Sequence, residues 1–272
     1  MKRYTYQHGF SAMHREVMYD QGGRYQKARK TLAVLIDFIA TTGHDPANLS
    51  LLDIGCSTGH MTQVYGSVFG KVVGIDIDES AVRHAEQNND LDNVIFSVSD
   101  SMSLGFEDDV FDCVTCTQIY EHVPDADRLM SEIYRVLKPG GVCYFAAGNR
   151  VKFMEPHYGL PLLSIPPKRI GHLYVRLAGK AELYYETHLS YWGLRKLVSQ
   201  FSIFDYTAKV IADPVKYHAT EIVRTDSLKQ MVALAILKVA YWLCPTYIWI
   251  LRKPVPRGDG RNPTPVSGRC LR

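Results

Sequence analysis

The chain has 272 residues, of which 46% are hydrophobic and 22% charged, enough to bury one good-sized core with some additions. Its formal net charge is +3, but residues 252–272 carry six cationic side chains against one carboxylate, so the rest of the chain is slightly acidic. Nucleic-acid-binding proteins usually carry a strongly basic surface, which a nearly neutral globular part does not provide. We therefore predict no nucleic-acid partner. The cysteines are scattered and the first residues lack the apolar stretch of a signal peptide, which predicts a reducing, cytoplasmic compartment.

The first part of the chain changes character near Arg24. Residues 1–23 show no clear periodicity, which predicts a loose or short-helical N-terminal arm. From Arg24, apolar side chains recur at helical spacing and Gly43 stops the pattern. An amphipathic helix that covers a sheet is therefore predicted, with its apolar face formed by Leu32, Leu35, Ile36 and Ile39.

A glycine turn follows the first predicted strand. The apolar run 51–54 ends at Gly55-Cys56-Ser57-Thr58-Gly59, and a helix starting near His60 would direct free N–H groups at a ligand there. The next apolar run, 71–75, ends at Asp76. Nucleotide-binding folds place a carboxylate about 20 residues past such a turn, where it holds ribose hydroxyls. The other interpretation of Asp76 is an N-cap of the following helix.

Three chemistries fit a turn of this kind. A dinucleotide site is disfavoured because Ser57 replaces the middle glycine of G-x-G-x-x-G. A nucleophile elbow, G-x-S-x-G, normally follows several strands, whereas a single helical pattern precedes Ser57. The third possibility is a site for S-adenosylmethionine.

The order of four motifs supports the third possibility. Residues 52–59, 73–76, 111–114 and 135–141 resemble the successive motifs of class I S-adenosylmethionine-dependent methyltransferases of the type 11-like group. The resemblance covers about residues 28–210. It implies an α/β fold with a doubly wound, mostly parallel seven-stranded sheet, the Rossmann-like methyltransferase fold. The alternation of predicted strands and helices from 50 to 148 agrees with such a sheet.

The resemblance also implies S-adenosylmethionine as cofactor. The turn would hold its methionine part, Asp76 its ribose hydroxyls, and Asp100 with Met102 its adenine. The full set of predicted cofactor-binding residues is Asp53, Gly55, Cys56, Ser57, Gly59, Asp76, Ile77, Asp100, Ser101, Met102 and Gln118.

Residues 150–187 interrupt the α/β alternation. They are rich in proline and aromatic residues, and we predict an inserted cap that overhangs the pocket, since open α/β sheets bind ligands at the carboxyl ends of their strands. If the acceptor is a hydroxyl, its proton needs a base, and a histidine is the usual one. His157 in the cap and His122 after the fourth strand are the candidates, with Glu155 and Tyr158 shaping the acceptor site.

Two further histidines and a cysteine pair are assigned other roles. His188 is predicted to cap or pack, and His60 to contact cofactor or solvent. Cys113 and Cys116 form C-x-x-C inside an apolar run, which predicts buried strand cysteines. Because acids and histidines show no ligand spacing, we predict no metal.

The C-terminal part is apolar and then basic. After a helix at 190–201 and a strand at 203–211, residues 226–251 form a hydrophobic segment interrupted by Lys238 and Pro245. We predict two short helices that lie on a membrane or on the domain, because their tryptophans and tyrosines suit a membrane interface. Packing on the sheet or in a dimer contact is the alternative. A basic disordered tail is predicted for 252–272.

These features predict methyl transfer to a small-molecule or lipid-linked acceptor. The cap is similar to that of bacterial methyltransferases of surface-polysaccharide and glycolipid assembly, which favours a hydroxyl of a glycan or glycolipid. A quinone or other isoprenoid-ring methyltransferase is the enzyme alternative, and a catalytically silent, cofactor-binding membrane adaptor the non-enzyme one. The expected location is cytoplasmic, with peripheral contact to the inner face of the membrane through 226–251. The oligomeric state stays open.

Overall fold

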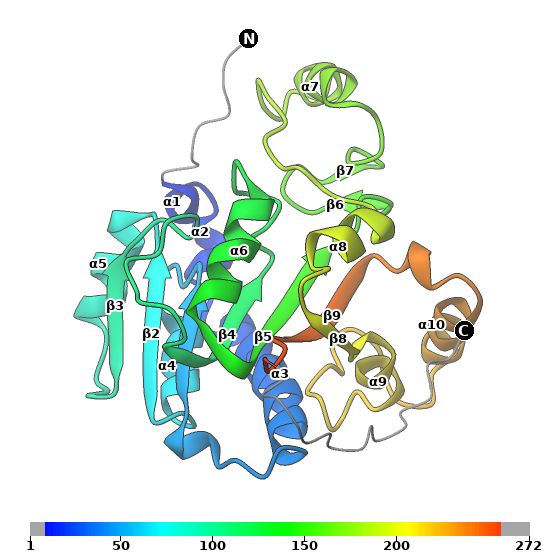
Figure 1. Cartoon of the computed structure of the whole chain (residues 1–272). Coiled ribbons are helices and arrows are strands. Elements are labelled where there is room, and N and C mark those ends of the chain that lie inside the picture. The colour runs from blue at the N-terminus through cyan, green and yellow to red at the C-terminus, as the bar shows by residue number, and fades with distance from the viewer. Residues whose placement is uncertain (1–8, 257–272) are drawn as a thin grey trace.

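The computed structural model describes residues 9–256. A central seven-stranded sheet has the order β3-β2-β1-β4-β5-β9-β8, and of these strands β9 runs opposite to the rest (Figure 1). This confirms the predicted doubly wound, mostly parallel sheet. The strands are β1 Ser50–Ile54, β2 Lys71–Asp76, β3 Val94–Val98, β4 Phe111–Thr117, β5 Leu137–Gly148, β8 Ser202–Asp205 and β9 Thr246–Arg252.

Helices cover both faces of the sheet (Figure 1). On one face lie α3 Gln21–Ala40, α4 His60–Gly66, α5 Glu79–Gln87 and α9 Thr207–Ala212, and on the other α6 Ala126–Val136 and α8 Tyr191–Leu197. Two short helices, α1 Phe10–Met13 and α2 Arg15–Met18, precede α3, and short 3₁₀ turns lie at η1 Pro46–Asn48 and η2 Tyr241–Leu243. The described part of the arm is thus short-helical, and α3 begins at Gln21, before Arg24.

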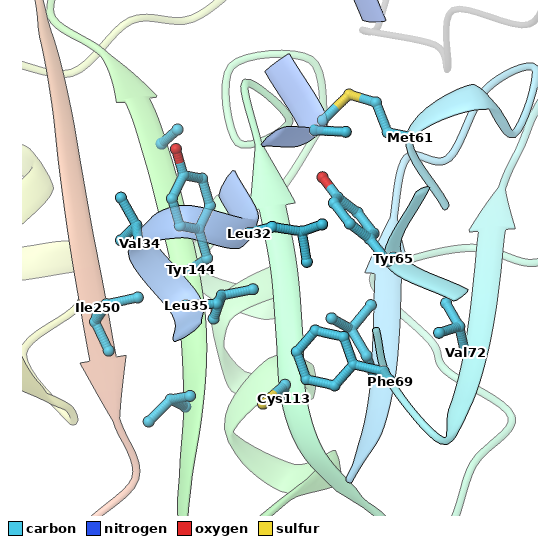
Figure 2. Packing of buried hydrophobic residues seen from close by; sticks show 14 of the residues in the cluster. Leu32, Val34, Leu35, Met61, Tyr65, Phe69, Val72, Cys113, Tyr144 and Ile250 are labelled. Atoms are coloured by element: carbon cyan, nitrogen blue, oxygen red, sulfur yellow. The ribbon is translucent and has the colours of Figure 1, made fainter. Parts of the chain in front are cut away.

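The core on the α3 face is packed as the sequence pattern predicts. Figure 2 shows Leu32 and Leu35 of α3 facing Tyr144 of β5 and Tyr65 of α4, all fully or almost fully buried. Ile36 is 40% exposed, because the buried stripe of α3 passes through positions 28, 31, 32, 35, 38 and 39. The predicted helical face was therefore wrong at that one position.

The cap follows β5 and stands above the carboxyl ends of the strands (Figure 1). It contains the two-stranded ribbon β6 Met154–Glu155 and β7 Leu160–Pro161, and helix α7 Lys168–Leu177. Its own small core consists of Leu160, Leu163, Val175 and Tyr184. A separately packed cap at 150–187 agrees with the proline-rich sequence there.

The hydrophobic segment 226–251 is only partly helical. Helix α10 Leu228–Val239 and η2 form its first half, but β9 forms its second half and lies between β5 and β8 in the sheet. The predicted second helix is wrong because Tyr247–Leu251 is a run of aromatic and β-branched residues after Pro245, and such a run suits a strand covered on both faces. The predicted domain limit at 211 was consequently too early, since β9 completes the same sheet.

Two neighbouring predictions also need revision. The expected strand 203–211 is strand only in β8, and α9 follows, with the Asp205 carboxylate accepting a hydrogen bond from Thr207 N at 2.8 Å. Arg252 belongs to β9 and not to a tail, and residues 257–272 lie outside the described residues. Between residues 9 and 256, none of the helices combines the length and apolar character needed to cross a bilayer.

Candidate active site

The glycine turn between β1 and α4 has a backbone that few residues other than glycine can adopt. Gly55 and Gly59 have φ of +75° and +80°, in the left-handed region. A Cβ atom at Gly55 would lie 2.2 Å from Ile119 Cδ1, and one at Gly59 would lie 2.7 Å from Ala85 Cβ. Ser57 also has positive φ, and its N–H donates to Asp76 Oδ2 at 2.8 Å. The turn is therefore fixed to the end of β2.

Asp53 supports this turn from beneath. Its carboxylate is buried and accepts hydrogen bonds from Thr62 Oγ1 and Thr115 Oγ1, both at 2.6 Å. Burial raises the pKa of Asp53 to about 6, although these hydrogen bonds and the charge of Arg24 act in the opposite direction. Asp53 thus ties β1 to α4 and β4 and holds the turn in place.

A cavity of about 990 Å³ opens above the carboxyl ends of the strands. Of the predicted cofactor-binding residues, those that line it are Gly55, Ser57, Asp76, Ile77, Asp100, Ser101 and Gln118. The others, Asp53, Cys56, Gly59 and Met102, lie behind the lining. Met102 is buried in the core, and its N–H donates to Asp100 Oδ1 at 2.8 Å, so it orients a lining residue.

Asp76 is a lining residue and not an N-cap. The cap of α5 is Asp78, whose carboxylate accepts from Ser80 N and Ala81 N. The Asp76 carboxylate accepts from Ser57 N and from Asp78 N at 2.9 Å. Burial raises the pKa of Asp76 despite these backbone hydrogen bonds.

The N-terminal arm closes one side of the cavity. Ser11 Oγ lies 2.8 Å from Ser57 Oγ, and Ser11 N donates to Asp78 Oδ2 at 3.2 Å. Thr58 Oγ1 donates to the carbonyl oxygen of Met18 at 2.8 Å. Because α1 and α2 are hydrogen-bonded to the glycine turn itself, a ligand there is covered by the arm.

Arg24 is a lining residue that the sequence patterns did not single out. It lies on α3, with its guanidinium against the sulfur atoms of Met18 and Met61. Burial lowers its pKa, and the charges of Asp53 and Asp76 partly offset that effect. The sequence did contain a pattern that points to Arg24: this residue lies one helical turn before Ala28, on the side of α3 that faces the sheet.

Three histidines that line the cavity lie close together. The rings of His122 and His157 are 4.8 Å apart between centroids, and His14 of the arm lies 5.8 Å from His157. Phe10 packs against His122 at 5.0 Å. The cap and the end of β4 thus bring both candidate bases into the cavity, together with a third histidine that the sequence did not single out.

The two candidate bases have different electrostatic surroundings. His157 Nδ1 lies 2.7 Å from Glu155 Oε1, which leaves Nε2 as the ring nitrogen for a ligand. Burial lowers the pKa of His157, but the hydrogen bond and the charge of Glu155 outweigh it, and the net shift is upward. Burial and the positive charges of His157 and Lys152 lower the pKa of His122 to about 3. His157 is therefore the stronger base.

Glu155 and Tyr158 do not line the cavity. Glu155 is fully buried and also accepts from His157 N and Tyr158 N, at 2.9 and 3.0 Å. The Tyr158 hydroxyl donates to the carbonyl oxygen of Leu183 and accepts from Tyr185 N, both at 3.3 Å. Glu155 hence orients His157, while Tyr158 holds the cap together.

A buried polar group lies behind the histidines. His188 Nε2 lies 2.6 Å from Lys152 Nζ, which is 3.7 Å from Glu155 Oε1. Burial, followed by the charge of Lys152, lowers the pKa of His188 to about 2, so this histidine is a neutral packing residue. Glu121 is fully buried, and burial raises its pKa to about 7, although its own backbone N–H and the charge of Lys152 act in the opposite direction.

Comparison with known proteins identifies the domain. Residues 52–145 match the model of the methyltransferase domain family. Residues 52–145 therefore form a methyltransferase domain, as the resemblance to the class I S-adenosylmethionine-dependent enzymes implied. S-adenosylmethionine is the cofactor of this methyltransferase family, as the motifs implied.

The relatives of the methyltransferase domain match it over part of their length. A demethylmenaquinone methyltransferase of Symbiobacterium thermophilum is 36% identical over 128 residues, 44% of this chain and 51% of that protein. A ubiquinone biosynthesis O-methyltransferase of Coxiella burnetii is 33% identical over 104 residues, 37% of this chain and 44% of that protein. The chain therefore spans about half the length of these relatives.

A solved structure shares the fold. An S-adenosylmethionine-dependent methyltransferase from Mesorhizobium loti has a TM-score of 0.51 and 17% identity, covering 77% of this chain and 93% of that one. The residues that line the cavity also fit the cofactor, since they offer charged groups of both signs, Arg24 and Asp76, beside the glycine turn. Within residues 9–256, His, Cys, Asp and Glu side chains form no group of three or more that could hold a metal ion.

Proposed function

We propose that this protein transfers a methyl group from S-adenosylmethionine to a hydroxyl group of an acceptor, with His157 as general base. The observation that carries the proposal is the Glu155–His157 pair at the edge of the cavity. A carboxylate on Nδ1 fixes the ring and stabilises its positive charge, so that Nε2 can take a proton.

The cofactor end of the cavity is assigned from the lining residues. Arg24 binds the carboxylate of the methionine part, because it is a half-buried cation that lines the cavity beside the glycine turn. Asp76 accepts hydrogen bonds from the ribose hydroxyls, and Asp100, Ser101 and Ile77 surround the adenine. Asp53, Cys56, Gly59 and Met102 support this lining from behind.

Bound S-adenosylmethionine supplies a methyl group already activated on a sulfonium sulfur. The protein has to align the acceptor oxygen in line with the bond that breaks and to exclude water. As the oxygen–carbon bond forms and the electron pair of the carbon–sulfur bond passes to sulfur, His157 Nε2 takes the hydroxyl proton. His122 stays neutral beside it and positions the ring through their edge-on contact.

The acceptor we favour is a hydroxyl of a glycan or glycolipid, for which the cap sequence is the support. A quinol ring is the second candidate, because the relatives quoted above include a ubiquinone biosynthesis O-methyltransferase and a demethylmenaquinone methyltransferase. Each of these two acceptors carries a hydroxyl group. The alternative to an enzyme is a cofactor-binding adaptor without activity. The His157–Glu155 pair argues against it, because an adaptor needs no base.

We also propose peripheral membrane contact through α10. The apolar side chains of α10 that are exposed and do not line the cavity are Leu228, Met231, Val232 and Val239, with Lys238 beside them. Since β9 is buried, the membrane-facing part is limited to α10 and the adjoining η2. A Leu228→Asp/Val239→Asp variant is expected to lose flotation with anionic liposomes; flotation equal to that of the wild type would contradict this contact.

Transfer of a tritium-labelled methyl group tests the reaction. The protein and labelled S-adenosylmethionine are incubated with a lipid extract in one reaction and with a glycan extract in another. We expect label in an alkali-stable product, as a methyl ether would be, and loss of labelling in His157→Ala. Alkali-labile label would show a carboxylate acceptor and contradict the hydroxyl proposal, and binding of S-adenosylhomocysteine without any labelling would favour the adaptor.

A further inference from the structure

The cavity continues well beyond the cofactor-binding end. Its volume of about 990 Å³ lies at the upper end of the roughly 300–1,000 Å³ of ligand sites, so it has room for a second ligand beside the cofactor. Away from the glycine turn its walls are apolar and come from α9, α10, η2 and the sheet. We call this part the apolar compartment and define it by Val210, Ala233, Ile236, Leu237, Leu243 and Ile248.

Helix α10 is placed as a roof and not as a core helix. Of its twelve residues Gln230 is the buried one, although most of the others are apolar. The Gln230 side chain donates to the carbonyl oxygens of Ile211 and Ala212, at 2.8 and 3.1 Å, and accepts from Asp226 N. These bonds tie the start of α10 to the end of α9, while Ala233, Ile236 and Leu237 face the cavity. Apolar side chains thus line a space that the sheet does not fill.

Cations also line the cavity, three of them on α3. Arg24, Lys27 and Lys30 stand at three-residue intervals on α3 and all line the cavity, as does Lys229 of α10. Lys30 is paired with Glu221 at 3.2 Å, and the Lys229 ammonium donates to the carbonyl oxygen of Ile222. Lys27 is exposed; partial desolvation and the charges of Arg24 and Lys30 lower its pKa, whereas Asp20 acts in the opposite direction. With Arg24 assigned to the cofactor, Lys27 is the cation placed for another anion.

The compartment joins the histidines through the centre of the cavity. Gln118, Ile119 and His122 lie between the glycine turn and the cap, and Thr246 and Pro245 continue the lining toward α10. A single ligand can therefore reach from the apolar compartment to His157.

We propose that the acceptor is an anionic amphiphile, whose apolar chain lies in the compartment under α10 and whose anionic group faces Lys27. The inference rests on the proposed function for the identity of the methylated molecule, and it names the substrate class. An anionic lipid that carries a sugar meets both requirements, the apolar chain and the anionic group. A neutral quinol with an isoprenoid chain meets the first requirement alone.

Binding of a fluorescent chain tests the compartment without turnover. The probe is 11-dansylaminoundecanoate, titrated into the full chain in the presence of saturating S-adenosylhomocysteine. We expect its emission to rise on binding. Ala233→Trp, which fills the compartment, and Ile236→Glu, which puts a charge in its lining, should each weaken binding at least roughly 10-fold. Ala235→Trp is the matched control, because Ala235 is exposed on the same helix and does not line the cavity; it should bind like the wild type.

The charge is tested with the same probe and its methyl ester. Lys27→Glu should weaken the carboxylate probe about 5-fold and leave the ester unchanged, whereas Lys238→Glu should change neither. Unchanged probe binding in both Ala233→Trp and Ile236→Glu overturns the compartment, and equal effects of Lys27→Glu on both probes overturn the anionic group. Calorimetry with S-adenosylhomocysteine is run on every variant, and an affinity equal to that of the wild type shows that the fold and the cofactor site are intact. If the wild type did not bind S-adenosylhomocysteine, the proposed function would be wrong. Binding of the fluorescent probe would still test the compartment by itself.

Discussion

At the scale of single residues, the candidate site is defined by charges that are held in unusual surroundings. Arg24 is a half-buried cation against two methionine sulfurs, and Glu155 is a buried carboxylate shared between His157 and two backbone N–H groups. Such groups are costly unless a partner or ligand compensates them. This is why Arg24 and His157, and not the more exposed polar residues of the arm, carry the functional proposals.

Arg24 should matter for one part of the cofactor only. Replacing it by glutamine removes the partner of the methionine carboxylate, and loss of a charged hydrogen bond corresponds to roughly 10- to 100-fold weaker binding of S-adenosylhomocysteine. Binding of 5′-methylthioadenosine, which lacks the amino-acid part, should stay unchanged. Calorimetry with both ligands measures the difference.

Arg29→Gln on the same helix is the control, since Arg29 lies against His218 and outside the cavity. It should bind both ligands like the wild type. Equal weakening of both ligands by Arg24→Gln would show that Arg24 stabilises the turn and does not bind the carboxylate.

The sequence predicted the residues whose role is local and missed those whose role depends on folding together. Gly55 and Gly59 were predictable, because a positive φ and a close approach leave a trace at the position itself. The sequence around His14 and Phe10 shows no comparable pattern, because these residues contact His157 only after α1 and α2 have folded against the site. The pairing of Glu155 with His157 could be suspected from their spacing, but the contrast in pKa between His157 and His122 depends on burial.

At the scale of elements, β9 is the main departure from the sequence prediction. An apolar run beyond Pro245 is compatible with a helix or a strand, and periodicity does not separate the two when both faces are buried. The structure shows a strand, because this run pairs with β5 on one side and with β8 on the other. The tryptophans at 242 and 249 looked equivalent in the sequence, yet Trp242 is 42% exposed and Trp249 is buried.

These two tryptophans give a matched test of the element. Trp249→Ala removes a buried aromatic side chain from the sheet and should lower the free energy of unfolding by about 3–5 kcal/mol. Trp242→Ala should cost less than about 1 kcal/mol, because its side chain is partly in solvent. Urea unfolding followed by circular dichroism measures both. Equal losses would mean that β9 does not form the central ladder described above.

At the scale of the whole molecule, the cap and the sheet enclose a set of buried ionisable groups. Lys152, Glu155, Glu121 and Glu186 come from the cap, its C-terminal connection and the end of β4, and each influences the pKa of another. Only the folded arrangement of cap on sheet creates this set, so the sequence predicted the cap at 150–187 but not its ionic contact with the site.

Glu121 should make the stability of the protein depend on pH. Its pKa is about 7 in the folded protein against 4.5 ordinarily, so the folded state holds its proton more tightly and stability is lost as pH rises from about 4.5 through 7. Glu121→Gln removes this loss. Relative to the wild type, the variant should gain about 2–3 kcal/mol between pH 5 and pH 8.

Urea unfolding at the two pH values provides the comparison. Other groups with raised pKa values, such as Asp53, titrate in both proteins, and the difference between the proteins therefore isolates Glu121. Parallel changes in wild type and variant would mean that Glu121 is charged and solvated at neutral pH, against its burial.

The assignment of His157 as the base is the central claim, and the rate of methyl transfer in histidine variants tests it most directly. With the labelled acceptor fraction as substrate and S-adenosylhomocysteine affinity as the control, His157→Ala should lower kcat by about 10²- to 10⁴-fold, and His122→Ala far less. In the wild type, the rate should rise with pH through a pKa above 6.5, because the base must be neutral to act. An unchanged kcat in His157→Ala, or an equal loss in His122→Ala, would contradict the account.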